Sequence, residues 1–203
     1  MARPRIVGID ANHDEATIPP FEYRKRNVYP AFQDTRFDLQ TFSGPEATNA
    51  TVDAKAVTPI AYLTGSGHGR RDLFYGFETR TLYGLNSDQM DEPKGKIVHF
   101  LACETAIKLG PDFVAHGCKA FFGYDDIFVY PSSNDPEFFA CDSEIDLLFA
   151  QGFTAGKVEE RVRELFDQTI DALRQQGKLQ KAALLEQNRD SLRRFGNKTA
   201  RLL

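Results

Sequence analysis

Residues 60–69 read IAYLTGSGHG, and residues 97–105 read IVHFLACET. Each stretch begins with a short apolar run, which is typical of a fully buried parallel strand. Each also ends in a reactive side chain, His68 in the first and Cys103 in the second. In an open parallel sheet, functional groups lie just beyond the carboxyl ends of the strands. If the two strands are neighbours, His68 and Cys103 face one crevice as a base and a nucleophile.

Further strand and helix patterns flank these two stretches. Strands are predicted at residues 5–11, 37–42, 60–64, 97–102 and 119–123, with a hairpin at 73–85. Helices are predicted at 47–57, 105–118, 144–150, 157–176 and 179–195, with a long loop over 124–141. Residues 23–35 mix charged and aromatic side chains and predict no single element.

This alternation of strands and helices predicts an α/β fold with a mostly parallel sheet covered on both faces. No composition shift marks a domain boundary, so we expect one domain over residues 1–203. The last predicted helix is highly charged, which leaves open whether residues 178–203 form a C-terminal helical appendage.

The bulk composition is that of an ordinary globular protein. Of the 203 residues, 41% are hydrophobic and 27% are charged. The formal net charge of -4 gives no argument for a nucleic-acid partner or an anionic membrane. Three cysteines without framework spacing favour a reducing compartment. No run has membrane-spanning length, and no signal peptide is recognisable, so we expect a cytoplasmic protein.

Nucleotide and metal sites fit the sequence less well than a nucleophile and base. Residues 65–69 are rich in glycine, but Arg70 stands where a dinucleotide fingerprint requires its third glycine. The paired cysteine spacing of a structural zinc site is missing. The remaining histidines and cysteines of this region are expected to be structural: His99, His116, Cys118 and Cys141. We predict neither a metal nor a cofactor.

His68 and Cys103 carry the functional hypothesis. Gly69 leaves room for a substrate backbone and exposes an amide. Cys103 is predicted at a strand-to-helix turn, where a helix N-terminus lowers the pKa of a thiol. The amides of Gly69 and Cys103 are candidates for an oxyanion hole. The alternative is a buried cysteine beside an unrelated turn histidine, and spacing alone leaves both readings open.

Several short motifs in the same order resemble a known family. They read SGPEAT at residues 43–48, GHG at 67–69, LACET at 101–105, GCKAFFGY at 117–124 and QGFT at 151–154. With these motifs the chain resembles the caspase-like cysteine peptidases of clan CD, and most closely their bacterial CHAT-type branch. The resemblance covers roughly residues 5–173.

The resemblance implies a caspase-like three-layer α/β sandwich and cysteine-dependent peptide cleavage. It implies that His68 is the catalytic histidine, Cys103 the nucleophile and Gly69 a donor to the oxyanion. The caspase pattern Gln-Ala-Cys is absent, because Leu101 and Ala102 precede the cysteine. Cys103 follows His68 by 35 residues, which is shorter than the roughly 50 residues of caspases. Specificity for aspartate is therefore not carried over.

We accordingly predict a cysteine endopeptidase that acts on a protein or peptide substrate, with a regulatory protein as a further partner. One alternative is a catalytically silent caspase-like module that binds a protein partner. Another is a flavodoxin-like domain that binds a small ligand. A cysteine-directed peptide warhead distinguishes the peptidase from the silent module, which stays unlabelled. Copurified nucleotide or flavin absorbance would support the small-ligand domain.

Asp125 and Asp126 follow the strand predicted at 119–123. In the family resembled, this segment borders the pocket for the residue before the cleaved bond. A carboxylate there favours a basic side chain in the substrate. Asp10 and Asp14, after the first strand, are rivals for the same role. The alternative is that Asp125 and Asp126 are ordinary solvated acids of a loop.

Overall fold

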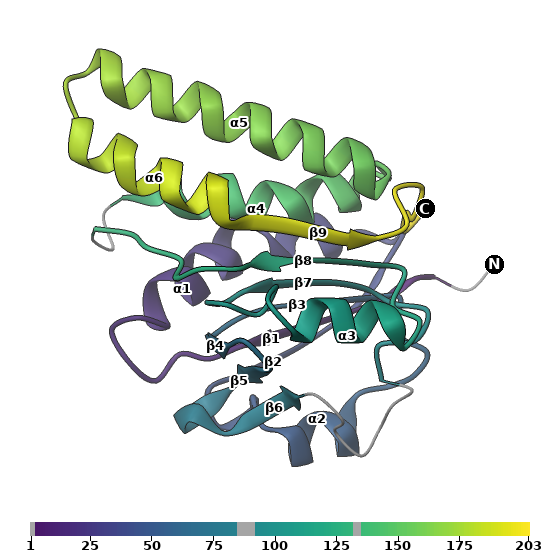
Figure 1. Ribbon diagram of the computed structural model, residues 1–203. Helices are drawn as coiled ribbons and strands as arrows, with labels where there is room; N and C mark the ends of the chain where they lie inside the picture. Colours follow the sequence, from purple (N-terminus) through teal and green to yellow (C-terminus); the bar gives the residue numbers. More distant parts are fainter. Residues whose placement is uncertain (1–2, 85–91, 132–134) are drawn as a thin grey trace.

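The protein is built on a six-stranded sheet, seen in a computed structural model that describes residues 3–84, 92–131 and 135–203 (Figure 1). The strand order is β2-β1-β3-β7-β8-β9, and every neighbouring pair is parallel except β8 and β9. These strands are β1 (Arg5–Asp10), β2 (Asp38–Ser43), β3 (Tyr62–Ser66), β7 (Ile97–Leu101), β8 (Ala120–Tyr124) and β9 (Leu192–Gly196). The predicted mostly parallel sheet is confirmed.

Helices cover one face of this sheet, as Figure 1 shows. They are α1 (Ile18–Asn27), α4 (Pro136–Ala150), α5 (Ala155–Gln175) and α6 (Leu179–Ser191), with the short helix η1 (Tyr29–Phe32). Ile6, Tyr62 and Phe122 point from the sheet into this layer. This layer buries their side chains completely. The core that they form with the helices is the larger of the two cores.

The other face carries α2 (Asn49–Lys55), α3 (Leu109–Ala115) and a small antiparallel sheet (Figure 1). The small sheet consists of β4 (His68–Arg70), β5 (Leu73–Tyr75) and β6 (Thr81–Gly84), flanked by the short helices η2 (Gly44–Glu46) and η3 (Phe77–Thr79). Val7, Leu63 and Phe121 point into this second core. Successive strand residues thus serve opposite faces, and the result is the predicted three-layer sandwich.

The hairpin predicted at residues 73–85 is confirmed as β5 and β6, apart from Leu85, which lies outside the described residues. It is joined by β4, so His68 itself lies in the small sheet. Phe74 stacks on Phe100 of the central sheet with ring centroids 4.1 Å apart. This contact fixes the small sheet against the strand that leads to Cys103.

The structure corrects four predicted elements. The helix expected at 105–118 is only Leu109–Ala115, because the preceding residues hydrogen-bond to other segments. The amide of Ala106, for example, donates to the carbonyl of Tyr124. The loop expected at 124–141 already gives way to α4 at Pro136, a residue suited to the first turn of a helix. Residues 18–27, for which no helix is predicted, form α1.

The fourth correction concerns the C-terminal region. The helix expected at 179–195 ends at Ser191, and Leu192–Gly196 forms β9. Phe195 of β9 pairs with Phe121 of β8 and extends the central sheet. This pairing places residues 192–196 in the central sheet, and the assignment of residues 178–203 to one domain stays a prediction. Within the described residues, none of the helices combines the length and apolar character needed to cross a membrane.

Candidate active site

The predicted reactive residues lie beyond the carboxyl ends of two adjacent parallel strands. Ser66 of β3 is in register with Leu101 of β7, and His68 and Cys103 each follow two residues later. The amide of Gly67 donates to the carbonyl of Leu101 over 3.2 Å, so the two strand exits stay together. The adjacency on which the sequence argument depended is therefore present in the fold.

Gly69 lies directly against the loop that carries Cys103. A Cβ atom at residue 69 would come within 2.3 Å of the carbonyl oxygen of Cys103 and 3.0 Å of the Cβ of Ala102. Contacts this short are impossible for a side chain, so only glycine lets the two loops approach so closely. Close approach, and not unusual backbone torsion, explains the glycine after His68.

The environment of Cys103 keeps its sulfur protonated. Burial raises the pKa of the Cys103 thiol, and the carboxylates of Glu104 and Asp126 raise it further. The backbone amides of Phe128 and of Cys103 itself act in the opposite direction. The predicted helix N-terminus does not act on the thiol, since α3 begins only at Leu109. The expectation of a lowered thiol pKa is therefore wrong.

Glu104, directly after Cys103, has a left-handed backbone with φ of +57°. This conformation costs energy for a residue with a side chain. It is maintained by a hydrogen bond from the Glu104 amide to the carbonyl of Asp126. The chain therefore turns sharply at Glu104, and the thiol of Cys103 lies half-buried just beyond the end of β7.

Asp14 pairs with His68. The Nε2 atom of His68 lies 2.7 Å from Oδ2 of Asp14. The other carboxylate oxygen of Asp14 accepts hydrogen bonds from the amides of Ala16 and Thr17 and from the Thr17 hydroxyl, at 2.8–3.1 Å. Partial burial opposes the charge of Asp14, but hydrogen bonds from His68 and Thr17 lower its pKa to about 2. A fixed, charged carboxylate thus orients the imidazole.

His13 belongs to the same cluster, although the sequence analysis gave it no role. Its Nε2 atom lies 3.4 Å from Oδ2 of Asp14, and its ring contacts the rings of His68 and Phe77 edge-on. One signal was available, because residues 13 and 14 closely follow the carboxyl end of β1. That end adjoins β3 in the sheet.

Asp10, the last residue of β1, is structural. It is completely buried and accepts hydrogen bonds from Arg24 at 3.0 Å and from the hydroxyl of Ser66 at 2.7 Å. It also receives the hydroxyl of Tyr29. These bonds tie the exits of β1 and β3 together and leave Asp10 unavailable to a substrate. The structure therefore argues against Asp10 as a rival for substrate recognition, and Asp14 is already paired with His68.

Asp125 and Asp126 differ in their surroundings. The carboxylate of Asp125 forms an ion pair with Arg193 of β9 at 2.7 Å. Asp126 is exposed, and its carboxylate accepts a hydrogen bond from the amide of Ile127. Asp126 is also near enough to the Cys103 thiol to raise its pKa.

The remaining histidines and cysteines named from the sequence lie away from this cluster. His99 is completely buried between Asp142 and Asp146, and His116 caps the end of α3. Cys118 and Cys141 are buried, and burial raises the pKa of each thiol to about 12. None of these thiols is activated for nucleophilic attack.

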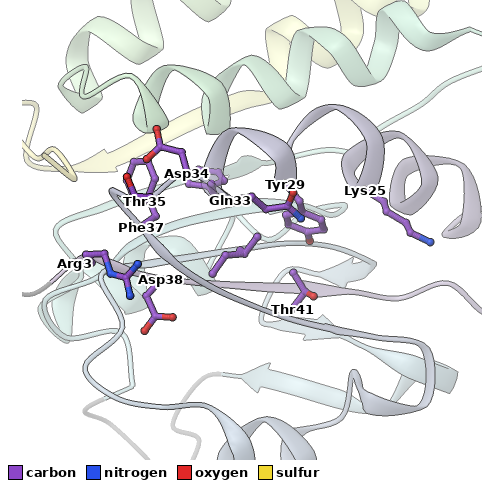
Figure 2. Close-up of a pocket in the computed structure, with 11 residues that line it drawn as sticks. Arg3, Lys25, Tyr29, Gln33, Asp34, Thr35, Phe37, Asp38 and Thr41 are labelled. Atoms are coloured by element: carbon purple, nitrogen blue, oxygen red, sulfur yellow. The ribbon is translucent and has the colours of Figure 1, made fainter.

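A cavity of 530 Å³ lies elsewhere, beside the edge strand β2 and the short helix η1 (Figure 2). Its lining includes Lys25, Tyr29 and Thr41, but neither His68 nor Cys103. The cavity is therefore not part of the candidate active site.

Comparisons with known proteins support the fold. No family model matches the chain, and no curated protein matches it in sequence. Among solved structures, the chain is similar to gingipain R (RgpB), an Arg-specific cysteine proteinase, with a TM-score of 0.62 at 12% sequence identity. The match covers 97% of this chain and 47% of that chain, so the protein spans about half the length of gingipain R. The chain thus shares the caspase-like fold of gingipain R.

Proposed function

We propose that this protein is a cysteine endopeptidase in which Cys103 is the nucleophile and His68 the general base. The observation that carries the proposal is the meeting of the His68–Gly69 and Cys103 loops beyond β3 and β7, with a charged Asp14 on His68. A nucleophile, a base and a group that orients the base are the parts of a hydrolytic triad. The fold shared with a cysteine proteinase supports the same reaction class.

Asp14 determines which ring nitrogen of His68 accepts a proton. Because its carboxylate accepts from Nε2, the neutral imidazole carries its proton there and keeps Nδ1 as the free acceptor. As the sulfur of Cys103 attacks the substrate carbonyl, the thiol proton passes to Nδ1. The raised thiol pKa means that this transfer accompanies attack, because little thiolate exists beforehand.

The remaining steps return the enzyme to its starting state. The carbonyl oxygen becomes an oxyanion, for which the amides of Gly69 and Cys103 are the proposed donors. Collapse of this intermediate breaks the C–N bond, and His68 gives its proton to the departing amine. A thioester on Cys103 is left, and water activated by His68 hydrolyses it to release the acid.

Cleavage assays on purified variants test this assignment. Cys103→Ala abolishes cleavage, and His68→Ala reduces kcat by several orders of magnitude, as removal of a triad member does elsewhere. Cys118→Ala is the matched control, because this buried thiol lies outside the site. Full cleavage by Cys103→Ala, or its loss in a folded Cys118→Ala protein, contradicts the assignment.

We further propose that the enzyme prefers Arg or Lys before the cleaved bond. The exposed carboxylate of Asp126, near Cys103, is the proposed partner of the basic side chain. The Arg specificity of gingipain R supports this preference. Membership of the CHAT-type branch and a cytoplasmic location stay predictions from the sequence.

A peptide library varied at the position before the cut tests the preference. Asp126→Ala lowers kcat/KM for Arg substrates by about 10- to 100-fold, the effect expected when a charged hydrogen bond is lost. Asp125→Ala is the control, since its carboxylate is occupied by Arg193. A preference for Asp or for an apolar residue refutes the proposal, as does equal loss in both variants.

A further inference from the structure

Three side chains with metal-binding atoms converge beside the proposed catalytic histidine. One donor atom each from His13, Asp14 and His68 lies within 4.8 Å of the other two. Across residues 3–84, 92–131 and 135–203, this is the only group of at least three His, Cys, Asp or Glu residues arranged in this way. Only His68 and Asp14 have a part in the proposed peptidase reaction, which leaves His13 without a function.

The donor set suits Zn²⁺. Two imidazoles and one carboxylate form the protein ligands of many zinc sites that keep a fourth position open. Ligands about 2.1 Å from a tetrahedral ion lie about 3.4 Å apart. Nε2 of His13 already lies 3.4 Å from Oδ2 of Asp14, and Nε2 of His68 lies 2.7 Å from the same oxygen. The donor atoms of the two histidines lie within 4.8 Å of each other, so a rotation of the His68 ring would bring all three ligands toward this spacing.

The Asp14 carboxylate is held in place for metal binding, and the site is accessible to solvent. Hydrogen bonds from residues 16 and 17 hold Oδ1 of Asp14, so Oδ2 faces the two histidines. The side chains of Asp14 and His68 are 38% and 35% exposed, which gives an ion a path from solvent. Nδ1 of His13 is buried without a hydrogen-bond partner. A ligand imidazole normally donates through its other nitrogen, so we expect exchangeable binding, weaker than in a structural zinc site.

We propose that His13, Asp14 and His68 form a Zn²⁺ site that reversibly switches off the peptidase. The ion takes the place of the proton on Nε2 of His68. The neutral imidazole then carries its proton on Nδ1 and has no lone pair left to accept the thiol proton of Cys103. The binding site stands on its own geometry, whereas the inhibitory effect rests on the proposed function.

Zinc titration of the Cys103→Ala protein tests the site without the thiol as a competing ligand. Isothermal titration is expected to show one Zn²⁺ per chain. Adding His13→Gln weakens binding at least 10-fold, and so does adding His68→Gln, which alters a half-buried side chain at the surface of the site. His116→Gln is the matched control, because His116 also faces an aspartate, Asp112 at 3.5 Å, and leaves binding unchanged. Equal affinity in the His13→Gln and control proteins overturns the proposal.

Inhibition of the protein with Cys103 intact separates the site from the proposed function. Zn²⁺ inhibits cleavage by the unmodified chain, and His13→Gln raises the inhibitory concentration at least 10-fold. Equal inhibition of both proteins means that zinc acts at Cys103 itself and overturns the switch. If the chain binds zinc through His13 but has no peptidase activity, the zinc site is supported and the proposed function is refuted.

Discussion

At the scale of single residues, the central feature is a carboxylate that fixes the orientation of an imidazole. Asp14 is held by its own loop through Thr17, and it presents its free oxygen to His68. The thiol of Cys103, by contrast, is discouraged from ionising by burial and by nearby carboxylates. The proposed reaction therefore relies on a well-placed base more than on a preformed thiolate.

Asp14→Asn tests whether Asp14 orients the imidazole of His68. An amide in place of the carboxylate can donate to Nε2, which favours the wrong tautomer of His68, so we expect kcat to fall on the order of 10²- to 10⁴-fold. Asp34→Asn is the control, because Asp34 likewise accepts from a backbone amide two residues later, at Arg36, but pairs with no histidine. Similar activity in both variants, measured on folded protein, shows that Asp14 does not orient the base.

The sequence predicted that His68 and Cys103 follow neighbouring strands, which the sheet confirms, but it considered Asp14 only as a rival for substrate recognition. Apolar runs that end in a histidine and a cysteine reveal the strand exits, because burial in a parallel sheet requires such runs. The partner of Asp14 depends on the adjacency of β1 and β3 and on the turn closed by Thr17. Neither of these contacts can be predicted from the residues next to Asp14 in the sequence. The ion pair between Asp125 and Arg193 likewise joins residues that are far apart in the chain.

At the scale of elements, a buried charge cluster joins β7 to α4. His99 of β7 lies 3.1 Å from Asp142 and 3.2 Å from Asp146, both on α4. Tyr124 donates to Asp142, and Arg24 forms an ion pair with Asp146. Burial disfavours the imidazolium, but the two carboxylates outweigh burial and raise the pKa of His99 to about 9.

This cluster makes stability depend on pH. The pKa of His99 is about 9 in the folded chain and about 6.5 in the unfolded one, so the folded state binds the proton more tightly. The resulting stabilisation, roughly 3 kcal/mol, is complete below about pH 6.5 and is lost as the pH rises to about 9. Denaturant unfolding between these pH values measures the slope. His99→Gln removes it and His116→Gln retains it, whereas an unchanged slope in His99→Gln shows that His99 is not the titrating group.

Strands were easier to predict than helices. Buried parallel strands carry a clear apolar run, whereas α1 has two prolines in its first turn and mostly polar residues after them. The residues of β9, Leu192–Gly196, continue the charged pattern of α6, so their sequence also suits a helix. They form a strand because they pair with the edge of β8, which is distant from them in the sequence.

At the scale of the whole molecule, the C-terminal segment closes the sheet. Phe195 of β9 packs near Gly110 of α3, where a Cβ atom would lie 3.2 Å from its ring. Beyond β9, the carbonyls of Lys198 and Ala200 accept hydrogen bonds from the amides that begin α5. The segment therefore links both helical layers to the sheet.

Truncation tests whether this segment belongs to the domain. Removal of residues 192–203 strips the edge of β8 and exposes the second core, so we expect aggregation or a large loss of soluble protein. Removal of residues 201–203 alone is the control, because the hydrogen bonds of Lys198 and Ala200 remain. A soluble protein with unchanged melting temperature after the longer truncation would identify the segment as an appendage.

The most direct test of the proposed function is covalent labelling with a peptide that carries arginine and an electrophilic warhead, followed by peptide mapping in the mass spectrometer. We predict one adduct, on Cys103, which forms far more slowly in His68→Ala. An adduct on Cys118 or Cys141 in place of Cys103 would contradict it, and so would a chain that cleaves peptides while Cys103 stays unlabelled.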